Sequence, residues 1–172
     1  MKKWLQRITM TSSDPSTRKA TRGLLLLVIA LAVIGLDQLT KYLIRANMGL
    51  GESIPNTGII RLTYVTNTGG AFGIFASQTF LLALIAVIGI SVFLIYLRYI
   101  PLKSRLLKIG LGLDLGGAIG NLIDRLRLEG KVTDFIDIGP WPVFNVSDSA
   151  IVVGTILIAY YLLFTAQKKA RS

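Results

Sequence analysis

The sequence predicts an all-α membrane protein with four transmembrane helices, and three observations carry this prediction. Of the 172 residues, 52% are hydrophobic and 16% are charged, whereas about 25% are charged in an average soluble domain. The mean hydropathy is +0.62, and the apolar residues lie in four long blocks. Most basic residues lie before the first block, between the second and third blocks, and after the fourth. A single membrane-embedded domain accounts for all three observations.

Each apolar block approaches the roughly 20 residues that a helix needs to cross a bilayer. The expected spans are residues 24–44, 79–97, 106–124 and 148–164. The first contains Asp37 and Lys41 in its last third, the second has no charge, and the third is rich in glycine. All five prolines lie outside the spans, as continuous helices require.

The distribution of charge predicts how the chain is oriented in the membrane. Thirteen of the 19 basic residues, accompanied by only one acidic residue, lie in residues 1–23, 98–108 and 165–172. The positive-inside rule then puts these three segments, and so both termini, in the cytoplasm. The longer connections, residues 46–78 and 125–147, are expected outside. We attribute the net charge of +10 to this topology and expect no nucleic acid partner.

The same pattern predicts the domain organisation. Residues 1–22 are polar and are expected to be a flexible cytoplasmic tail. Residues 23–166 form the membrane domain, and residues 167–172 are a second cytoplasmic tail.

The two outer connections carry short segments with the pattern of β-strands. Residues 59–65 are rich in β-branched side chains, and turn-forming residues flank them on both sides. Residues 132–138 have a similar pattern and are followed by Gly139 and Pro140. Trp141 is placed to anchor this connection at the membrane interface. We expect a small sheet at the outer membrane surface.

The chain contains no histidine and no cysteine, which excludes several kinds of chemistry. Ser-His-Asp and Cys-His catalysis, the usual zinc ligand sets and thiol redox chemistry all need these residues. We expect neither a metal nor another cofactor. The remaining candidates are ionisable groups in or beside the spans, which are costly and therefore mark functional sites: Asp37, Lys41, Asp114, Asp124, Asp134, Asp137 and Asp148.

Two groups among these candidates have an informative spacing. Asp37 and Lys41 are one helical turn apart, which predicts an acid–base pair or a direct contact with a substrate. Asp124 ends the third span and Asp148 begins the fourth, so both lie at the outer surface with Asp134 on the connection between them. Two carboxyl groups that share one site also share a proton, and can then act as general acid and general base on water. Spacing leaves open whether Asp148 pairs with Asp124 or Asp134, or only caps its helix.

Short motifs place these candidates in a recognisable order. They are Gly116-Gly117-Ala118-Ile119-Gly120-Asn121-Leu122-Ile123-Asp124-Arg125, Val132-Thr133-Asp134-Phe135-Ile136-Asp137, and Phe144-Asn145-Val146-Ser147-Asp148-Ser149-Ala150. Asn67-Thr68-Gly69-Gly70-Ala71-Phe72-Gly73 precedes them, and Asp37 and Lys41 lie in the first span. Together, over residues 24–165, the chain resembles the lipoprotein signal peptidase family, also called signal peptidase II.

The resemblance implies an aspartic endopeptidase of the bacterial cytoplasmic membrane with its active site at the outer face. Such enzymes remove the signal peptide of prolipoproteins by cutting before a diacylglyceryl-modified cysteine, so the partners would be these precursors and membrane lipid. The implied fold has four helices, a small β-cradle and a short outer helix, and we expect a monomer. The implied catalytic pair is Asp134 and Asp148, with Asp124 as the second choice. The implied supporting residues are Asp37, Lys41, Asn67, Asn121, Asp124, Arg125 and Asn145.

Three features depart from the family pattern. Ser147 stands where alanine is usual, the connection from Asp134 to Asp148 is a few residues short, and Asp114 replaces an expected apolar residue. Asp114 lies about 15 Å deeper than Asp124 along the helix, and we assign it no role in the site.

Three other functions fit parts of the sequence. A transporter or proton-coupled channel would use Asp37, Asp114 and Asp124 as a relay through the membrane. A Ser-Lys protease would use Ser147 or Ser149 as nucleophile and Lys41 as base. A non-enzymatic membrane scaffold would need none of these residues.

The topology can be tested with single cysteines, because the chain has none of its own. In intact cells, Glu129→Cys should react with a membrane-impermeant thiol reagent, and Ser104→Cys should react only after the membrane is opened. The reason is that inversion would move thirteen basic residues to the outside, against the insertion bias. Labelling of Ser104→Cys from outside in intact cells would show that the true orientation is the reverse of the predicted one.

Overall fold

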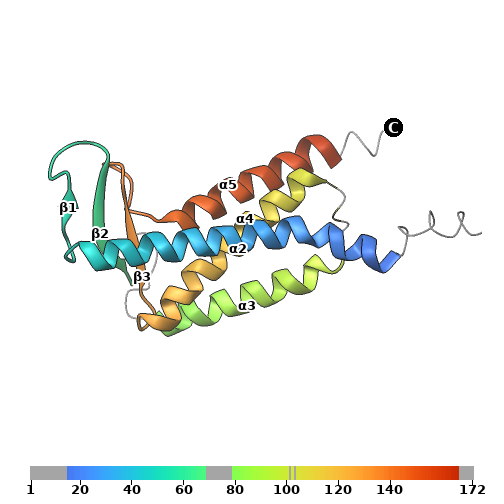
Figure 1. Cartoon of the computed structure of the whole chain (residues 1–172), viewed down its shortest axis with the longest axis horizontal. Coiled ribbons are helices and arrows are strands. Elements are labelled where there is room, and N and C mark those ends of the chain that lie inside the picture. The colour runs from blue at the N-terminus through green and yellow to red at the C-terminus, as the bar shows by residue number, and fades with distance from the viewer. Residues whose placement is uncertain (1–14, 69–78, 101, 103, 167–172) are drawn as a thin grey trace, which may run out of the picture.

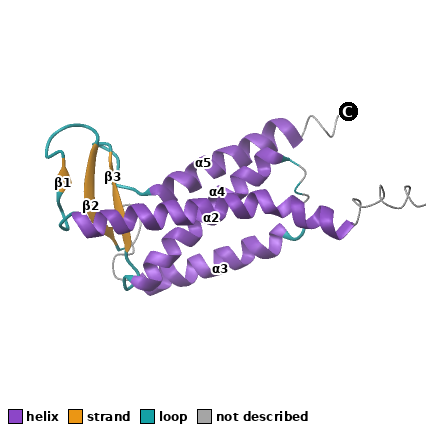
Figure 2. Ribbon diagram, in the orientation of Figure 1, coloured by secondary structure: helices purple, strands orange, loops and turns teal. Residues whose placement is uncertain are grey.

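The computed structural model describes residues 15–68, 79–100, 102 and 104–166. These residues form four α-helices and one three-stranded sheet (Figure 1, Figure 2). In chain order they are α2 (Pro15–Asn47), β1 (Ser53–Ile54), β2 (Arg61–Asn67), α3 (Thr79–Leu97), α4 (Arg105–Arg127), β3 (Val132–Asp137) and α5 (Val146–Tyr160), which continues as the π-helix η2 (Tyr161–Ala166). The four expected helices and the two expected strands are therefore confirmed, and β1 is an addition.

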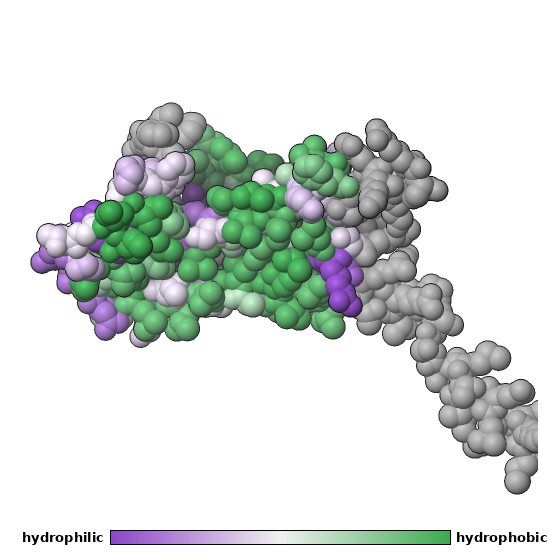
Figure 3. Space-filling view, turned by 90° about the horizontal axis from the view of Figure 1, so that it is seen from above, coloured by the Kyte–Doolittle hydropathy of each residue, from purple (hydrophilic) through white to green (hydrophobic). Residues whose placement is uncertain are grey.

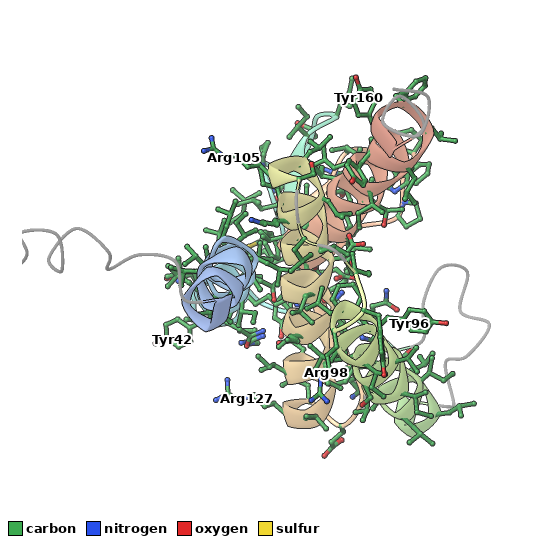
Figure 4. All side chains as sticks on the ribbon, turned by 90° about the vertical axis from the view of Figure 1, so that its right-hand side faces the viewer. Tyr42, Tyr96, Arg98, Arg105, Arg127 and Tyr160 are labelled. Carbon is green, nitrogen blue, oxygen red and sulfur yellow. The ribbon has the colours of Figure 1, made fainter. Side chains whose placement is uncertain are left out.

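Helix α4 lies in the centre of the bundle. Viewed along the bundle, α2 lies on one side of α4, and α3 and α5 lie on the other (Figure 4). Glycines allow the close approach: a Cβ at Gly116 would lie 2.7 Å from Val33 Cβ and 2.8 Å from the Ala30 carbonyl oxygen on α2. Small residues commonly bring membrane helices together in this way. The glycine-rich sequence of α4 thus explains why this helix is the central one.

Among the described residues, three helices are long and apolar enough to cross a membrane, over Gly23–Asn47, Arg105–Arg127 and Val146–Phe164. Their outward side chains are apolar, and one face of the molecule is hydrophobic over the helices and hydrophilic at both ends (Figure 3). The chain is therefore an integral membrane protein. In α3 the apolar stretch Leu81–Leu97 is shorter, so its role as a fourth span stays a prediction, as does the orientation of the termini.

The sheet lies at one end of the bundle, opposite the connection from α3 to α4 (Figure 1). Its strands are antiparallel in the order β1-β2-β3. Phe135 of β3 is buried against Ile44 and Met48 at the end of α2, which fixes the sheet on the bundle. Val65 lies opposite Asp134, and Asn67 lies opposite Val132. Asp134 is thereby presented at the junction of sheet and helices.

The structure differs from expectation at the beginning of the first helix. Helix α2 begins at Pro15 and not near Leu24, so residues 15–22, which we assigned to the flexible tail, are helical. Proline suits the first turn of a helix because no hydrogen bond from its nitrogen is needed there. None of the described residues forms the expected short outer helix, and residues 69–73 of the first-loop motif lie outside the described part of the chain.

Filling the contact between α2 and α4 should destabilise the protein. Gly116→Ala puts a methyl group into backbone and side-chain atoms of α2, and we expect a loss of about 1–3 kcal/mol in the free energy of unfolding. Gly35→Ala is the matched control, because a Cβ there meets nothing within 4 Å. Thermal unfolding in detergent measures both. Equal melting temperatures for the two variants would show that this contact does not need glycine.

Candidate active site

A cluster of buried polar side chains fills the end of the bundle beneath the sheet. It draws on α2, α4, β3 and the start of α5. Its members are nearly all withdrawn from solvent: Asp37, Lys41, Asn121, Asp124, Thr133, Asp134, Asn145 and Ser147. Buried polar groups are costly unless their hydrogen bonds and charges are matched. The partners of each group therefore indicate what the cluster can do.

Lys41 lies at the centre of the cluster, and its side chain is fully buried. Its Nζ lies 2.9 Å from Asp37 Oδ2 and 3.5 Å from Asp124 Oδ2, and donates to Asn121 Oδ1 at 2.9 Å. The expected pair of Asp37 and Lys41 is therefore confirmed, and it extends to α4. Because a buried charge without a partner would be strongly destabilising, this contact fixes α2 relative to α4.

The carboxylate of Asp124 is occupied by donors from two elements, α2 and β3. It accepts the Thr133 backbone N–H at 2.9 Å and Gln38 Nε2 at 3.3 Å, and Arg45 Nη1 lies 3.5 Å away. Asp124 is also 1% exposed, so water has little access to it. These contacts suit a residue that holds the beginning of β3 in place, next to Asp134.

Asn145 connects the two carboxyl groups of the implied pair. Its Nδ2 donates to Asp134 Oδ1 at 2.6 Å and to Asn121 Oδ1 at 3.1 Å. Its Oδ1 accepts the Asp148 backbone N–H at 2.9 Å, and its own N–H donates to Asp148 Oδ2 at 3.2 Å. These last two bonds form the capping box of α5. Asp148 therefore does cap its helix, and it lies beside Asp134 as well.

Asn121 completes the arrangement from α4, because its Nδ2 donates to Asp148 Oδ1 at 2.8 Å. Both oxygens of Asp148 thus accept hydrogen bonds. Asp148 is partly exposed, whereas Asp134 is 2% exposed. The two carboxyl groups therefore share a site but have different surroundings.

Burial raises the pKa of Asp134 to about 7, and the negative charge of Asp148 adds to this effect. Hydrogen bonds from Asn145 and Asn67 and the charge of Lys41 act in the opposite direction. Asn67 reaches Asp134 from β2 because it pairs with Val132, so the two side chains are diagonal neighbours on one face of the sheet. Near neutral pH, Asp134 can therefore hold a proton.

Arg125 brings positive charge to the cluster without forming an ion pair. Its guanidinium interacts electrostatically with Asp148, Asp134 and Asp124. Within the described part of the chain, no acid lies within 4 Å of it. Its Nε is buried and has no hydrogen-bond partner. A guanidinium in this state is a donor available for a further ligand.

Three residues of the cluster were missing from the sequence-based set. Gln38 donates to Asp37, to the Gly120 carbonyl oxygen and to Asp124, and an amide beside Asp37 in an apolar span was a usable signal. Arg45 donates to Thr133 Oγ1 at 2.9 Å, one further turn after Lys41. Thr133 takes part largely through its backbone, for which the sequence gives no signal.

Two candidate acids lie away from the cluster. Asp114 accepts a hydrogen bond from Thr155 at 3.5 Å, deeper in the bundle. Asp137 lies on the sheet, where it pairs with Arg61 at 2.7 Å. Hydrogen bonds from the Gly139 N–H and Thr63, together with Arg61, hold the pKa of Asp137 below its ordinary value. Asp137 therefore stabilises the sheet.

The serine candidates do not contact the lysine in the described part of the chain. Lys41 Nζ is paired with Asp37, Asn121 and Asp124. Ser147 Oγ is buried without a partner, and Ser149 Oγ donates to the Asn145 carbonyl oxygen. Among the described residues, neither serine reaches Lys41 Nζ, which already has three partners, so this geometry does not favour a Ser-Lys protease.

An apolar cavity of about 370 Å³ opens beside Asp148. Its other lining residues come from α5 and from the connection that follows β3: Ile138, Trp141, Phe144, Ser149, Val152 and Val153. Trp141 is 66% exposed. At Asp148, the cluster therefore opens onto an apolar cavity that runs along α5.

Comparisons with known proteins agree on one family. A family model described as signal peptidase (SPase) II matches residues 29–164. The lipoprotein signal peptidase of Moorella thermoacetica is 47% identical over 146 residues, which cover 84% of this chain and 97% of that protein. That of Halothermothrix orenii is 45% identical over 136 residues, which cover 78% and 92%. A bacterial membrane enzyme solved by the in meso method has a TM-score of 0.72 at 34% identity, covering 84% of this chain and 90% of that chain.

Replacing Asp134 by asparagine should change how stability depends on pH. Because the pKa of Asp134 is raised to about 7, the folded protein keeps a proton that the unfolded chain has already released. The wild type therefore loses stability as the pH rises from the ordinary Asp pKa toward 7. Between about pH 5 and about pH 8 this loss should be about 2 kcal/mol, and Asp134→Asn should not show it.

Thermal unfolding in detergent at the two pH values measures this difference. Asp137→Asn is the matched control, because the pKa of Asp137 is lowered and its charge therefore contributes stability above the ordinary Asp pKa. That variant should be less stable than the wild type by a similar amount at both pH values, since both lie above the ordinary Asp pKa. Parallel curves for wild type and Asp134→Asn would show that Asp134 is not protonated in the folded protein near neutral pH.

Proposed function

The chain belongs to the signal peptidase II family, and from this membership and the geometry of its carboxyl groups we propose that it is an aspartic endopeptidase. Lipoprotein signal peptidases process prolipoproteins by removing the signal peptide. We propose that this chain cuts before the diacylglyceryl-modified cysteine, at the outer face of the bacterial cytoplasmic membrane. We propose that Asp134 and Asp148 are its catalytic residues and that it works as a monomer.

The observation that carries this proposal is the shared hydrogen bonding of Asp134 and Asp148 through Asn145. Asp148, which accepts hydrogen bonds from Asn121 and from the Asn145 backbone N–H, would accept a proton from water as general base. Asp134, whose pKa is raised to about 7, would donate its proton to the carbonyl oxygen of the scissile bond. Two carboxyl groups whose environments separate their protonation states are the usual arrangement for this chemistry.

The supporting residues would position this pair and stabilise charge. Asn145 and Asn67 bond to Asp134, and Arg125 has a buried Nε without a partner. We propose that the Arg125 guanidinium donates to a substrate carbonyl group, where it would stabilise developing negative charge. Asp124 is the weaker candidate for the catalytic pair, because donors from Thr133 and Gln38 already occupy its carboxylate.

The apolar cavity beside Asp148 supports a lipid-bearing substrate. It joins the catalytic carboxylate to aliphatic and aromatic side chains of α5 and of the connection after β3. The apolar lining would keep an acyl chain out of water, where each exposed CH₂ group would cost about 0.8 kcal/mol. We propose that the lipid of the modified cysteine lies along this cavity while the scissile bond reaches Asp134 and Asp148.

The proposed orientation rests on charge at the two ends of the bundle. The connection between α3 and α4, with basic residues such as Arg98 and Arg105, lies at the end opposite the sheet (Figure 1). The positive-inside rule puts this end in the cytoplasm, with α3 as the fourth span. The sheet and the buried carboxyl groups would then face the outside, where a translocated lipoprotein precursor presents its cysteine.

Asp134→Asn and Asp148→Asn should each lower the rate of precursor cleavage by about 100-fold or more, because an amide can neither accept nor donate the required proton. Both variants should insert and fold, since an amide has nearly the shape of the carboxyl group. The assay measures cleavage of a diacylglyceryl-modified precursor by the purified protein in detergent, with thermal unfolding as the folding control.

Asp124→Asn and Ser149→Ala are the matched controls. Ser149→Ala should retain activity, and Asp124→Asn should retain part of it with a lower melting temperature, because it weakens the contacts of Lys41 and Thr133. Loss of all activity in Asp124→Asn alone, with near-normal turnover in Asp134→Asn, would move the pair to Asp124 and Asp148. Inactive but folded Ser149→Ala would favour serine chemistry.

A further inference from the structure

Asp114 is an ionisable side chain within a span that the buried cluster does not use. It lies on α4, and its Oδ2 accepts a hydrogen bond from Thr155 Oγ1 on α5 at 3.5 Å. Its Oδ1 is buried without a hydrogen-bond partner and lies against Gly154, where a side chain would collide with it. Gly154 therefore leaves room for the carboxyl group.

Asp114 also lines an apolar cavity of about 190 Å³ between α3, α4 and α5. The other lining residues are Gly89, Ile90, Phe93, Leu115, Ala118 and Ile151. The carboxyl group is the only ionisable group of this lining. At 3.5 Å, the hydrogen bond from Thr155 to Asp114 is long and therefore weak. Among the described residues, most of the capacity of the Asp114 carboxyl group to accept hydrogen bonds is thus unused.

We propose that Asp114 accepts a hydrogen bond from a side-chain hydroxyl in the membrane segment of the substrate, and so helps to select which signal peptides are cleaved. This inference rests on the proposed function. Asp114 and the cavity between α3, α4 and α5 would recognise the signal peptide. Catalysis by Asp134 and Asp148 and binding of the lipid would be separate roles.

The position of the cavity relative to the catalytic pair supports this assignment. On α4, Ala118 and Asn121 follow Asp114 by four and seven residues, and on α5, Ile151 and Thr155 follow Asp148 by three and seven. Residues at these spacings share one face of a helix. The cavity therefore lies between two contacts of α4 with α5: Asn121 with Asp148, and Asp114 with Thr155. A peptide leaving the catalytic pair along this face reaches the cavity next.

The chemistry of the cavity selects the donor. A helical signal peptide uses its backbone N–H groups within the helix, so only a side chain can donate to Asp114. Lysine and arginine are expensive in the middle of a membrane span, whereas serine and threonine are common at contacts between membrane helices. A hydroxyl group is thus the donor that such a substrate can bring at the lowest cost.

The distance predicts where this hydroxyl lies in the substrate. Seven residues of α4 separate Asp114 from Asn121, which is about 10 Å along the helix axis. The same distance corresponds to about seven residues of a helical substrate. Because the signal peptide precedes the cut, the hydroxyl should lie in a window of about six to eight residues before the scissile bond.

The test uses a set of lipidated precursors with an apolar signal peptide, in which one residue at a time in this window is changed from alanine to serine. In the wild type, serine at one or two adjacent positions should raise kcat/KM about two- to tenfold over the all-alanine precursor. Asp114→Leu should abolish this preference and leave cleavage of the all-alanine precursor within about twofold. Asp114→Asn keeps an acceptor oxygen and should retain part of the preference.

Thr155→Val is the control on α5, because it leaves the Asp114 carboxyl group without its protein donor. It should keep or increase the preference for serine. A wild type that cleaves all precursors equally, or a serine preference that persists in Asp114→Leu, would overturn the inference. If Asp114→Leu slowed every precursor to the same degree and lowered the melting temperature, Asp114 would only join α4 to α5. A wild type that cleaves no lipidated precursor would instead reject the proposed function.

Discussion

The structure depends on one buried ammonium group, that of Lys41. Its contacts with Asp37 and Asp124 join α2 to α4. Asp37 also accepts the Ser147 backbone N–H at the start of α5, and Asp124 accepts the Thr133 N–H at the start of β3. A single cation thus determines how four elements meet. In a membrane, where hydrophobic burial distinguishes poorly between helix pairs, such polar contacts fix a specific arrangement.

The charges of the cluster nearly balance. Four carboxyl groups, those of Asp37, Asp124, Asp134 and Asp148, lie near three cations, those of Lys41, Arg45 and Arg125. The cluster has one negative charge in excess when every acid is ionised, and it is neutral when one acid is protonated. Asp134, the more buried acid of the proposed catalytic pair, is the natural holder of that proton because burial raises its pKa.

The sequence predicted the elements better than it predicted their contacts. Hydropathy was sufficient for the four helices, and β-branched residues were sufficient for β2 and β3, because both signals are local. The choice between Asp124 and Asp134 was not local, since it depends on which oxygens the Thr133 and Gln38 donors occupy after the chain has folded. The helical start at Pro15 was missed because residues 15–22 are polar and resemble a tail. Asn121 and Asn145 were expected only as supporting residues of the family motif. The sequence did not predict which side chains they bond to.

The capping box of α5 places structural and chemical demands on the same side chains. Asn145 caps the first turn of α5 and also donates a hydrogen bond to Asp134. Asp148 accepts the Asn145 backbone N–H and lies next to Asp134. The first turn of α5 and the spacing of the two acids therefore form as a single event. A partly unwound α5 would hold no assembled pair. A protease embedded among other membrane helices would then be inert until its own folding is complete, which protects its neighbours during biogenesis.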